Sequence, residues 1–93
     1  MPNVRLVLLF GPLRSLIGRE ETIVEARNFK EVLSKLIKSY GENIMKIFFD
    51  EKGKGHPFNF LIMNGVNYSI DEALKLEFSR DITIYVWPAL DGG

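Results

Sequence analysis

The sequence predicts a single α+β domain, in which a mixed sheet of about five strands carries one main helix on one face. Two strand-like segments come first, one amphipathic helix follows, and further strands with short helical insertions complete the chain. One helix packed on one face of a mixed sheet is the economical way to bury these apolar stripes. The first and last strands are apolar on both faces, as central parallel strands tend to be. The length of 93 residues suits one domain with a modest core.

The first part of the chain predicts two strands joined by a short connector. Residues 4–10 form a strand by their length and apolar content, and Gly11 and Pro12 end it. Residues 13–19 are expected to be a connector, with Gly18 at a turn position. Residues 20–26 then predict a second strand, antiparallel to the first.

The clearest helix begins after Asn28. This residue suits the N-cap, and Glu31 stands three residues later, in the capping-box position. Apolar residues then recur at spacings of three and four, which predicts one buried helix face. Gly41 is a natural end for this helix. The stripe consists of Phe29, Val32, Leu33, Leu36, Ile37 and Tyr40.

The second half of the chain predicts two or more strands with short helical insertions. Asn64-Gly65 is the strongest hairpin signal in the sequence. The last strand is rich in β-branched and aromatic residues. In order, the expected elements are a short helix around 44–48, a polar glycine-rich loop over 50–57, a strand over 58–63, its return through 66–68, a helical turn or irregular connection over 70–76, and the last strand over 82–87.

The two doubly apolar strands also predict an apolar face that the helix cannot cover. We expect this face to be a partner interface, because exposed apolar patches usually mark one and Tyr and Trp are frequent anchors. The alternative is that the loop over 50–57 or the connector over 13–17 folds across it. If Leu6, Leu8, Ile84 and Val86 face the helix, the residues on the other side are Val7, Leu9, Tyr85 and Trp87.

The composition excludes several classes of function. Twelve basic and twelve acidic residues cancel, so no net field favours nucleic acid or an anionic membrane. The apolar runs are too short to span a bilayer, and the start of the chain does not resemble a signal peptide. We therefore expect a cytoplasmic protein with neither nucleic acid nor membrane among its partners.

Self-contained catalysis is also not expected. The absence of cysteine excludes disulfides, thiolate metal sites and a cysteine nucleophile. His56 is the only histidine, so neither a metal site with two histidines nor a convincing triad can form; we expect a solvated loop residue. No paired carboxylates are evident. We expect no bound cofactor or metal.

The most informative feature is the pair of glycines at 92 and 93, which follows the last strand and a short stiff leader. Without a Cβ atom, Gly92 and Gly93 can thread a narrow slot and carry the terminal carboxylate into another protein's active site. Pro88 restricts the backbone, while Ala89 and Leu90 can bury apolar surface in a groove. We therefore divide the chain into a domain over 1–87 and a flexible tail over 88–93.

Three stretches of the chain, residues 4–14, 64–67 and 81–93, are together similar to one known family. The sequence resembles the ubiquitin-like sulfur carriers, and most closely the small subunit of molybdopterin synthase. The resemblance implies the β-grasp fold. It also implies that Gly93 is the reactive residue and that Gly92 belongs to the site. From the uncovered face and the tail composition, the partner-binding residues that we expect are Val7, Leu9, Tyr85, Trp87, Pro88, Ala89, Leu90 and Asp91.

The resemblance further implies a mechanism. The Gly93 carboxylate, with an ordinary pKa of about 3.3–3.7, is ionised at neutral pH and is a poor acyl electrophile. An E1-like adenylating enzyme would activate it with ATP, and a sulfur donor protein would convert it to a thiocarboxylate. The large subunit of molybdopterin synthase would then accept the tail, and the sulfur would pass to the pterin precursor.

Other uses of the same activated terminus stay open. The chain resembles a carrier for the thiamine pathway or for tRNA thiolation less closely, since thiamine carriers are typically shorter. In a protein modifier, Gly93 would be joined to lysine amines of other proteins. In a simple interaction module, the two glycines would have no chemical role.

Overall fold

The computed structural model describes residues 1–8, 11–56 and 59–87. Predictions that concern residues 9–10, 57–58 and 88–93, including the tail, lie outside the described residues. In chain order the elements are β1 (Asn3–Leu8), α1 (Pro12–Ile17), β2 (Glu21–Glu25), α2 (Phe29–Tyr40), α3 (Asn43–Phe48), β3 (Phe60–Met63), β4 (Val66–Ser69), α4 (Ile70–Ala73) and β5 (Ile82–Trp87).

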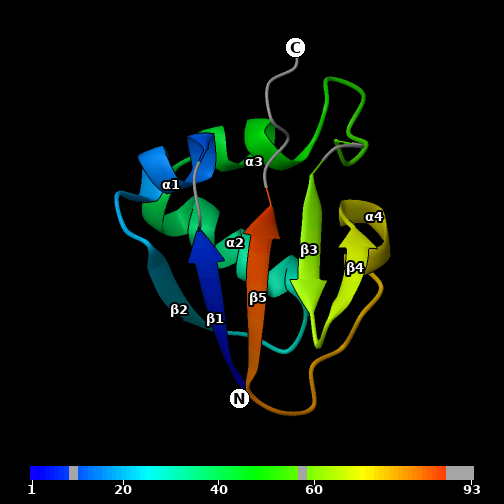
Figure 1. The fold of residues 1–93 in the computed structure, drawn as a ribbon. Helices are drawn as coiled ribbons and strands as arrows, with labels where there is room; N and C mark the ends of the chain where they lie inside the picture. The colour runs from blue at the N-terminus through cyan, green and yellow to red at the C-terminus, as the bar shows by residue number, and fades with distance from the viewer. Residues whose placement is uncertain (9–10, 57–58, 88–93) are drawn as a thin grey trace.

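The strands form one mixed sheet in the order β2-β1-β5-β3-β4, as Figure 1 shows. β1 and β5 pair in parallel at its centre, with Leu6 opposite Ile84. The other neighbouring pairs are antiparallel. Parallel neighbours require a crossover, and in Figure 1 helices α1, α2 and α3 all lie behind the sheet. The predicted α+β fold, with one main helix and short helical insertions, is confirmed.

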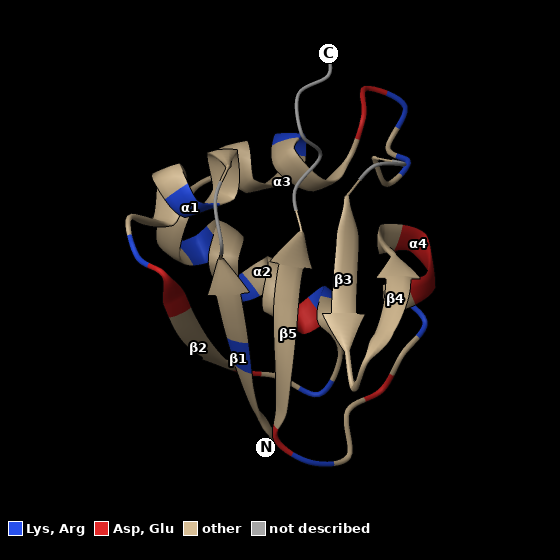
Figure 2. Cartoon of the chain, viewed as in Figure 1, with Lys and Arg blue, Asp and Glu red and all other residues tan. Residues whose placement is uncertain are grey.

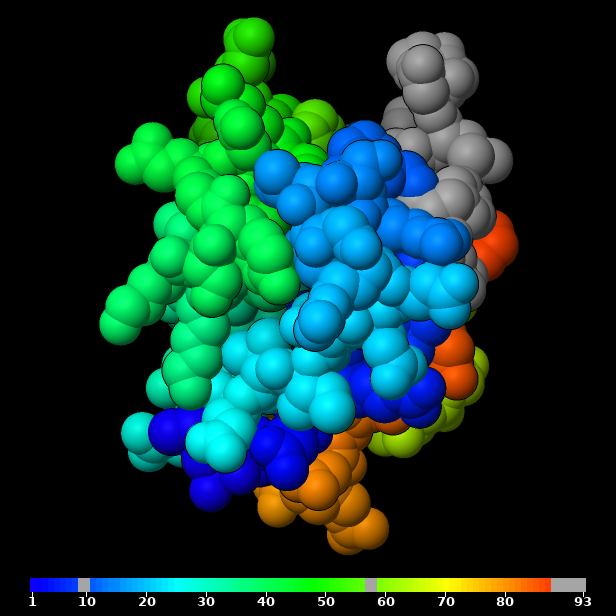
Figure 3. Space-filling view, turned by 90° about the vertical axis from the view of Figure 1, so that its left-hand side faces the viewer, coloured from blue at the N-terminus to red at the C-terminus, as the bar shows by residue number. Residues whose placement is uncertain are grey.

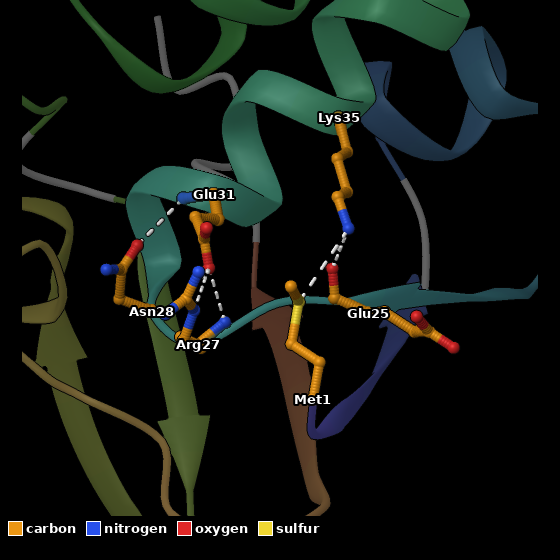
Figure 4. A network of polar contacts seen from close by, with 6 residues as sticks. All are labelled: Met1, Glu25, Arg27, Asn28, Glu31 and Lys35. Atoms are coloured by element: carbon orange, nitrogen blue, oxygen red, sulfur yellow. Dashed lines mark hydrogen bonds and ion pairs between the residues drawn. The ribbon is translucent and has the colours of Figure 1, made fainter.

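The main helix begins where the sequence predicts. The Asn28 side chain accepts a hydrogen bond of 2.9 Å from the Glu31 backbone N–H. The Glu31 carboxylate reaches back and accepts one of 2.7 Å from the Arg27 N–H, as Figure 4 shows. The return bond therefore reaches one residue further back than in a standard capping box. The helix ends at Gly41, whose φ of 92° suits a residue without a side chain.

The core lies between the sheet and these helices. Phe29 of α2 and Phe48 of α3 meet edge to face, with ring centroids 5.8 Å apart, in the arrangement that aromatic quadrupoles favour. The strands contribute every second side chain to this core, as the pleat requires. The buried strand residues are Val4, Leu6, Leu8, Leu61, Met63, Ile84 and Val86.

The expected connector over 13–19 is instead largely a helix, α1. Pro12 occupies its first turn, Leu13 and Ile17 are buried one turn apart, and Gly18 ends it with the left-handed φ of 78° expected of a turn residue. Six residues are too few to be stable as an isolated helix. Burial of Leu13 and Ile17 in the core stabilises it, and this packing cannot be seen in so short a sequence segment.

The hairpin and the final helical insertion follow local sequence rules. Asn64 and Gly65 both have positive φ, 52° and 77°, as a type I′ turn requires, which confirms the predicted hairpin. The expected helical turn is α4. It begins with a capping box, because the Glu72 N–H donates to Ser69 Oγ over 3.1 Å and the Ser69 N–H donates to Glu72 Oε1 over 2.8 Å.

Replacing Asn28 with alanine removes the side-chain acceptor at the start of α2. We expect Asn28→Ala to lower the free energy of unfolding by about 1 kcal/mol, measured by urea denaturation. The control is Asn43→Ala, at an exposed position in α3, where we expect a change below about 0.5 kcal/mol. Equal effects of both substitutions would contradict the capping role of Asn28.

The capping box of α4 lowers the pKa of Glu72, first through the Ser69 backbone N–H and then through the Ser69 hydroxyl. Because the folded pKa lies below the ordinary value of 4.5, this contribution to stability is complete above the ordinary value and is lost as the pH falls through the lowered one. NMR titration of the Glu72 carboxyl should show the lowered midpoint. Ser69→Ala should raise this midpoint towards the ordinary value without reaching it, because the backbone N–H donor remains. An unchanged midpoint in this variant would exclude the hydroxyl contribution.

Candidate functional site

The predicted reactive tail is attached to the centre of the sheet. β5 ends at Trp87, at the end of the sheet where α1 and α3 lie (Figure 1). The tail residues Pro88, Ala89, Leu90, Asp91, Gly92 and Gly93 lie outside the described residues, as does Leu9, so their roles stay predictions. The described part of the site is the surface of β5 and its neighbours.

The face of the sheet opposite the helices carries an apolar cluster. Tyr85 and Trp87 are 44% and 39% exposed. Tyr85 is opposite Val7 of β1 on one side and Ile62 of β3 on the other, while Trp87 is opposite Phe60 of β3. Directly opposite residues point to the same face of a sheet. We call Val7, Phe60, Ile62, Tyr85 and Trp87 the open-face cluster.

Neither alternative cover lies over this cluster among the described residues. Leu13 and Ile17 of α1 are buried in the core on the helical side of the sheet. Asp50–His56, the described part of the loop, is held at the side by a bridge between Phe49 and Gly55 and by a 3.3 Å hydrogen bond from the Gly55 N–H to Asp71. The view in Figure 1 looks onto the uncovered face. The predicted exposed face is therefore present at Val7, Tyr85 and Trp87.

Two members of the cluster, Phe60 and Ile62, were missed by the sequence analysis. Their alternation with the buried residues Leu61 and Met63 was the available signal, because side chains alternate between the two faces of a strand. Together with Asn67 of β4, they and Trp87 line a shallow pocket. This pocket lies beside Trp87, the last residue of β5, so it could accept an apolar side chain there.

The charged residues of the sheet lie on β1 and β2, at one side of this face. Strands β3, β4 and β5 carry no charged residue, and Figure 2 shows them without blue or red. Towards the β2 edge, the Arg5 guanidinium donates to Glu21 Oε2 from Nε over 2.8 Å and from Nη2 over 2.5 Å. This hydrogen-bonded pair raises the pKa of Arg5. The open face thus has an apolar centre with a polar border at the β2 edge, as protein interfaces commonly have.

The described residues offer no metal-binding cluster. Over 1–8, 11–56 and 59–87, no group of three His, Cys, Asp or Glu side chains could hold a metal ion. His56, expected to be solvated, is half-buried, and its Nε2 lies 3.3 Å from the Lys46 carbonyl oxygen. Its contacts hold the loop against α3. In this part of the chain, no helix is long and apolar enough to cross a membrane.

Comparison with known proteins gives structural matches only. No family model and no curated protein sequence matches the chain. The solution structure of small archaeal modifier protein 1 from Methanosarcina acetivorans is similar, with a TM-score of 0.72 and 27% identity over 100% of this chain and 98% of that one. A putative molybdopterin converting factor subunit 1 from Pyrococcus furiosus has a TM-score of 0.59 and 21% identity, over 97% of this chain and 100% of that one.

A third match comes from the crystal structure of the BexX/CysO complex of Amycolatopsis orientalis, with a TM-score of 0.68 and 19% identity, over 97% of this chain and 99% of the matched chain. At these identities the comparisons speak mainly to the fold. They confirm the β-grasp architecture and the predicted resemblance to ubiquitin-like sulfur carriers at that level.

The open-face cluster should be needed for binding but not for folding. We expect Trp87→Asp and Tyr85→Asp each to weaken the complex with the E1-like adenylating enzyme, the partner expected from the sequence, by about tenfold or more, measured by isothermal titration calorimetry. Val66→Asp is the matched control, because Val66 is 48% exposed on a strand but lies outside the cluster. Loss of the folded circular dichroism spectrum in Trp87→Asp would show instead that Trp87 belongs to the core.

Proposed function

We propose that this chain, which has the fold of the ubiquitin-like sulfur carriers, carries sulfur as a thiocarboxylate on Gly93. The observation that carries the proposal is the continuity of β5: one central strand presents Tyr85 and Trp87 on an uncovered face and leads directly into the Gly92-Gly93 tail. The partner surface and the reactive terminus therefore belong to the same segment. The structural matches to a modifier protein and to a molybdopterin converting factor subunit support this class of function.

The chemistry requires two steps on the terminal carboxylate. In the first, a carboxylate oxygen of Gly93 attacks the α-phosphate of ATP on the adenylating enzyme, and pyrophosphate leaves. In the second, the outer sulfur of a persulfide on the donor protein attacks the acyl carbon, and AMP leaves with the electron pair of the broken carbon–oxygen bond. The product is an acyl disulfide between Gly93 and the donor. A thiol then attacks the donor's sulfur atom and breaks the sulfur–sulfur bond, which releases the Gly93 thiocarboxylate and leaves the donor in a disulfide with that thiol. In this proposal the chain supplies the reactive group, while its partners supply catalysis and ATP. We expect no cofactor bound to this chain itself.

We assign the carrier to molybdopterin synthesis in the cytoplasm, as the small subunit that delivers sulfur to the pterin precursor in the active site of the large subunit. The similar Pyrococcus furiosus structure is named as a molybdopterin converting factor subunit, which favours this branch over the thiamine and tRNA-thiolation carriers. The similar chain from Amycolatopsis orientalis was crystallised in the BexX/CysO complex. By analogy, we expect the open-face cluster to contact the large subunit while the tail enters its active site.

The second candidate is a protein modifier joined through Gly93 to lysine amines. The observation that favours it is the 27% identity with small archaeal modifier protein 1. Both functions need the same acyl-adenylate, and they differ in the nucleophile that follows: sulfur in one case and an amine in the other. A single chain can serve both if both nucleophiles reach the activated terminus.

The carrier function is tested by the intact mass of the chain after co-expression with its adenylating enzyme and sulfur donor. We expect a population in which one terminal oxygen is replaced by sulfur. Deletion of Gly93 should abolish it, whereas the control Gly53→Asn, which keeps both terminal glycines, should not. Only the unmodified acid under competent conditions would contradict sulfur transfer. Heavier species on denaturing gels that depend on Gly93 would support the modifier function instead.

A further inference from the structure

The outer edge of β2 offers backbone groups for pairing. β2 is the edge strand next to β1. The Leu8 N–H donates to the Glu20 carbonyl over 2.7 Å, and the Ala26 N–H donates to the Pro2 carbonyl over 3.0 Å. In an antiparallel pair, the backbone N–H and C=O groups of alternate residues point towards the neighbouring strand. Even-numbered residues of this segment therefore direct these groups towards β1. Glu21, Ile23 and Glu25 direct theirs away from the sheet.

A groove runs along this edge between β2 and α2. Its lining includes the apolar residues Val24, Leu36 and Tyr40. The charged residues of the lining are Lys35 and Lys38 on the helix and Glu25 on the strand. Figure 3 looks onto this side of the molecule. Val24 is opposite the buried Val4 and therefore faces α2, whereas Ile23 faces the open side of the sheet and is 62% exposed.

Lys35 marks one end of the available edge. Its ammonium group donates to the Glu25 carbonyl oxygen and lies 4.0 Å from Met1 Sδ, as Figure 4 shows. This contact satisfies one outward backbone group at the end of β2. Among residues 1–8, 11–56 and 59–87, no backbone group pairs with the outward N–H and C=O groups of Glu21 and Ile23, which can therefore pair with another strand.

We propose that this groove binds an extended acidic segment of a partner protein, which adds to the sheet as a strand beside β2. Backbone hydrogen bonds to Ile23 supply the register, as in other cases of strand addition. Every second side chain of the segment then faces α2. An apolar side chain fits there against Val24 and Tyr40, and flanking carboxylates meet Lys35 and Lys38.

Charge also argues against a second copy of this chain as the occupant. Antiparallel pairing of two β2 strands centred on Ile23 would place Glu21 of one copy opposite Glu25 of the other, twice per interface. Like charges directly opposite each other on a sheet are destabilising. The carboxylates of Glu21 and Glu25 also favour neutral or basic residues at those segment positions that lie on the sheet face opposite the helices. The segment expected here is therefore acidic on one face only.

The proposal does not depend on the sulfur-carrier function. The groove lies at the β2 edge, whereas the open-face cluster centres on β5 and β3. A variant without Gly92 and Gly93 should bind the segment as the full chain does. Failure of the groove proposal and failure of the carrier proposal are thus separable.

The test is an amide NMR titration of the full chain with the synthetic peptide Thr-Asp-Thr-Val-Thr-Asp-Thr. In an extended strand, its valine and two aspartates share one face, and its threonines share the other. We expect shifts in β2 and in the second half of α2 at peptide concentrations up to about 1 mM, the range of weak specific binding. A peptide with lysine in place of aspartate should bind about tenfold more weakly, because attraction to two ammonium groups becomes repulsion.

Variants of the groove give the matched comparison. Lys35→Glu combined with Lys38→Glu should reverse the preference between the two peptides, while Lys30→Glu, an equivalent change outside the groove lining, should not. Ile23→Pro removes an outward N–H without removing a bond to β1, so it should abolish binding of the acidic peptide. If this variant does not fold, the lysine variants decide.

Three results would overturn the proposal. One is equal binding of both peptides by the unmodified chain. Another is the absence of shifts in β2, or shifts confined to the open-face cluster. The third is sedimentation that shows a dimer formed through β2 without peptide, which would assign the edge to a second copy.

Discussion

The parallel pairing of β1 with β5 is the constraint on which the rest of this structure depends. It brings the first and last strands together at the centre of the sheet, and a parallel pair requires a crossover, here made with the helices on one face. Leu6 and Ile84 are buried beneath those helices, while Tyr85 and Trp87 remain on the other face. The same pairing that closes the core therefore leaves an apolar surface beside the origin of the tail.

This arrangement separates the structural charges from the proposed chemistry. Arg5 pairs with Glu21 at the polar border of the open face, and Glu72 caps α4. Both interactions serve the fold, and neither lies at the end of β5. The proposed reactive group is the main-chain carboxylate of Gly93. In the proposed function, the domain contributes only its terminus. It then needs a rigid strand before the tail and an apolar surface for partner binding beside that strand. The central position of β5 supplies both.

Most of the fold could be predicted because its signals are local. The periodicity of α2, the Asn28 cap and the Asn64-Gly65 turn each depend on residues within a few positions of one another, so short windows of sequence contain them. Helix α1 could not be predicted in this way. Leu13 and Ile17 are helical because they are buried against distant parts of the chain, and six residues carry too little periodicity to show it.

The sequence by itself determined that the last strand has two apolar faces and is followed by two glycines, which predicts both an interface and a reactive terminus. Only the tertiary structure decided what joins that interface. Phe60 and Ile62 stand beside Trp87 and Tyr85 because β3 pairs with β5, and the groove of Lys35 and Lys38 exists because α2 packs along the β2 edge. The alternation of apolar side chains within a strand can be read from neighbouring residues, because it depends only on local sequence. The pairing of strands depends on contacts between residues far apart in the chain.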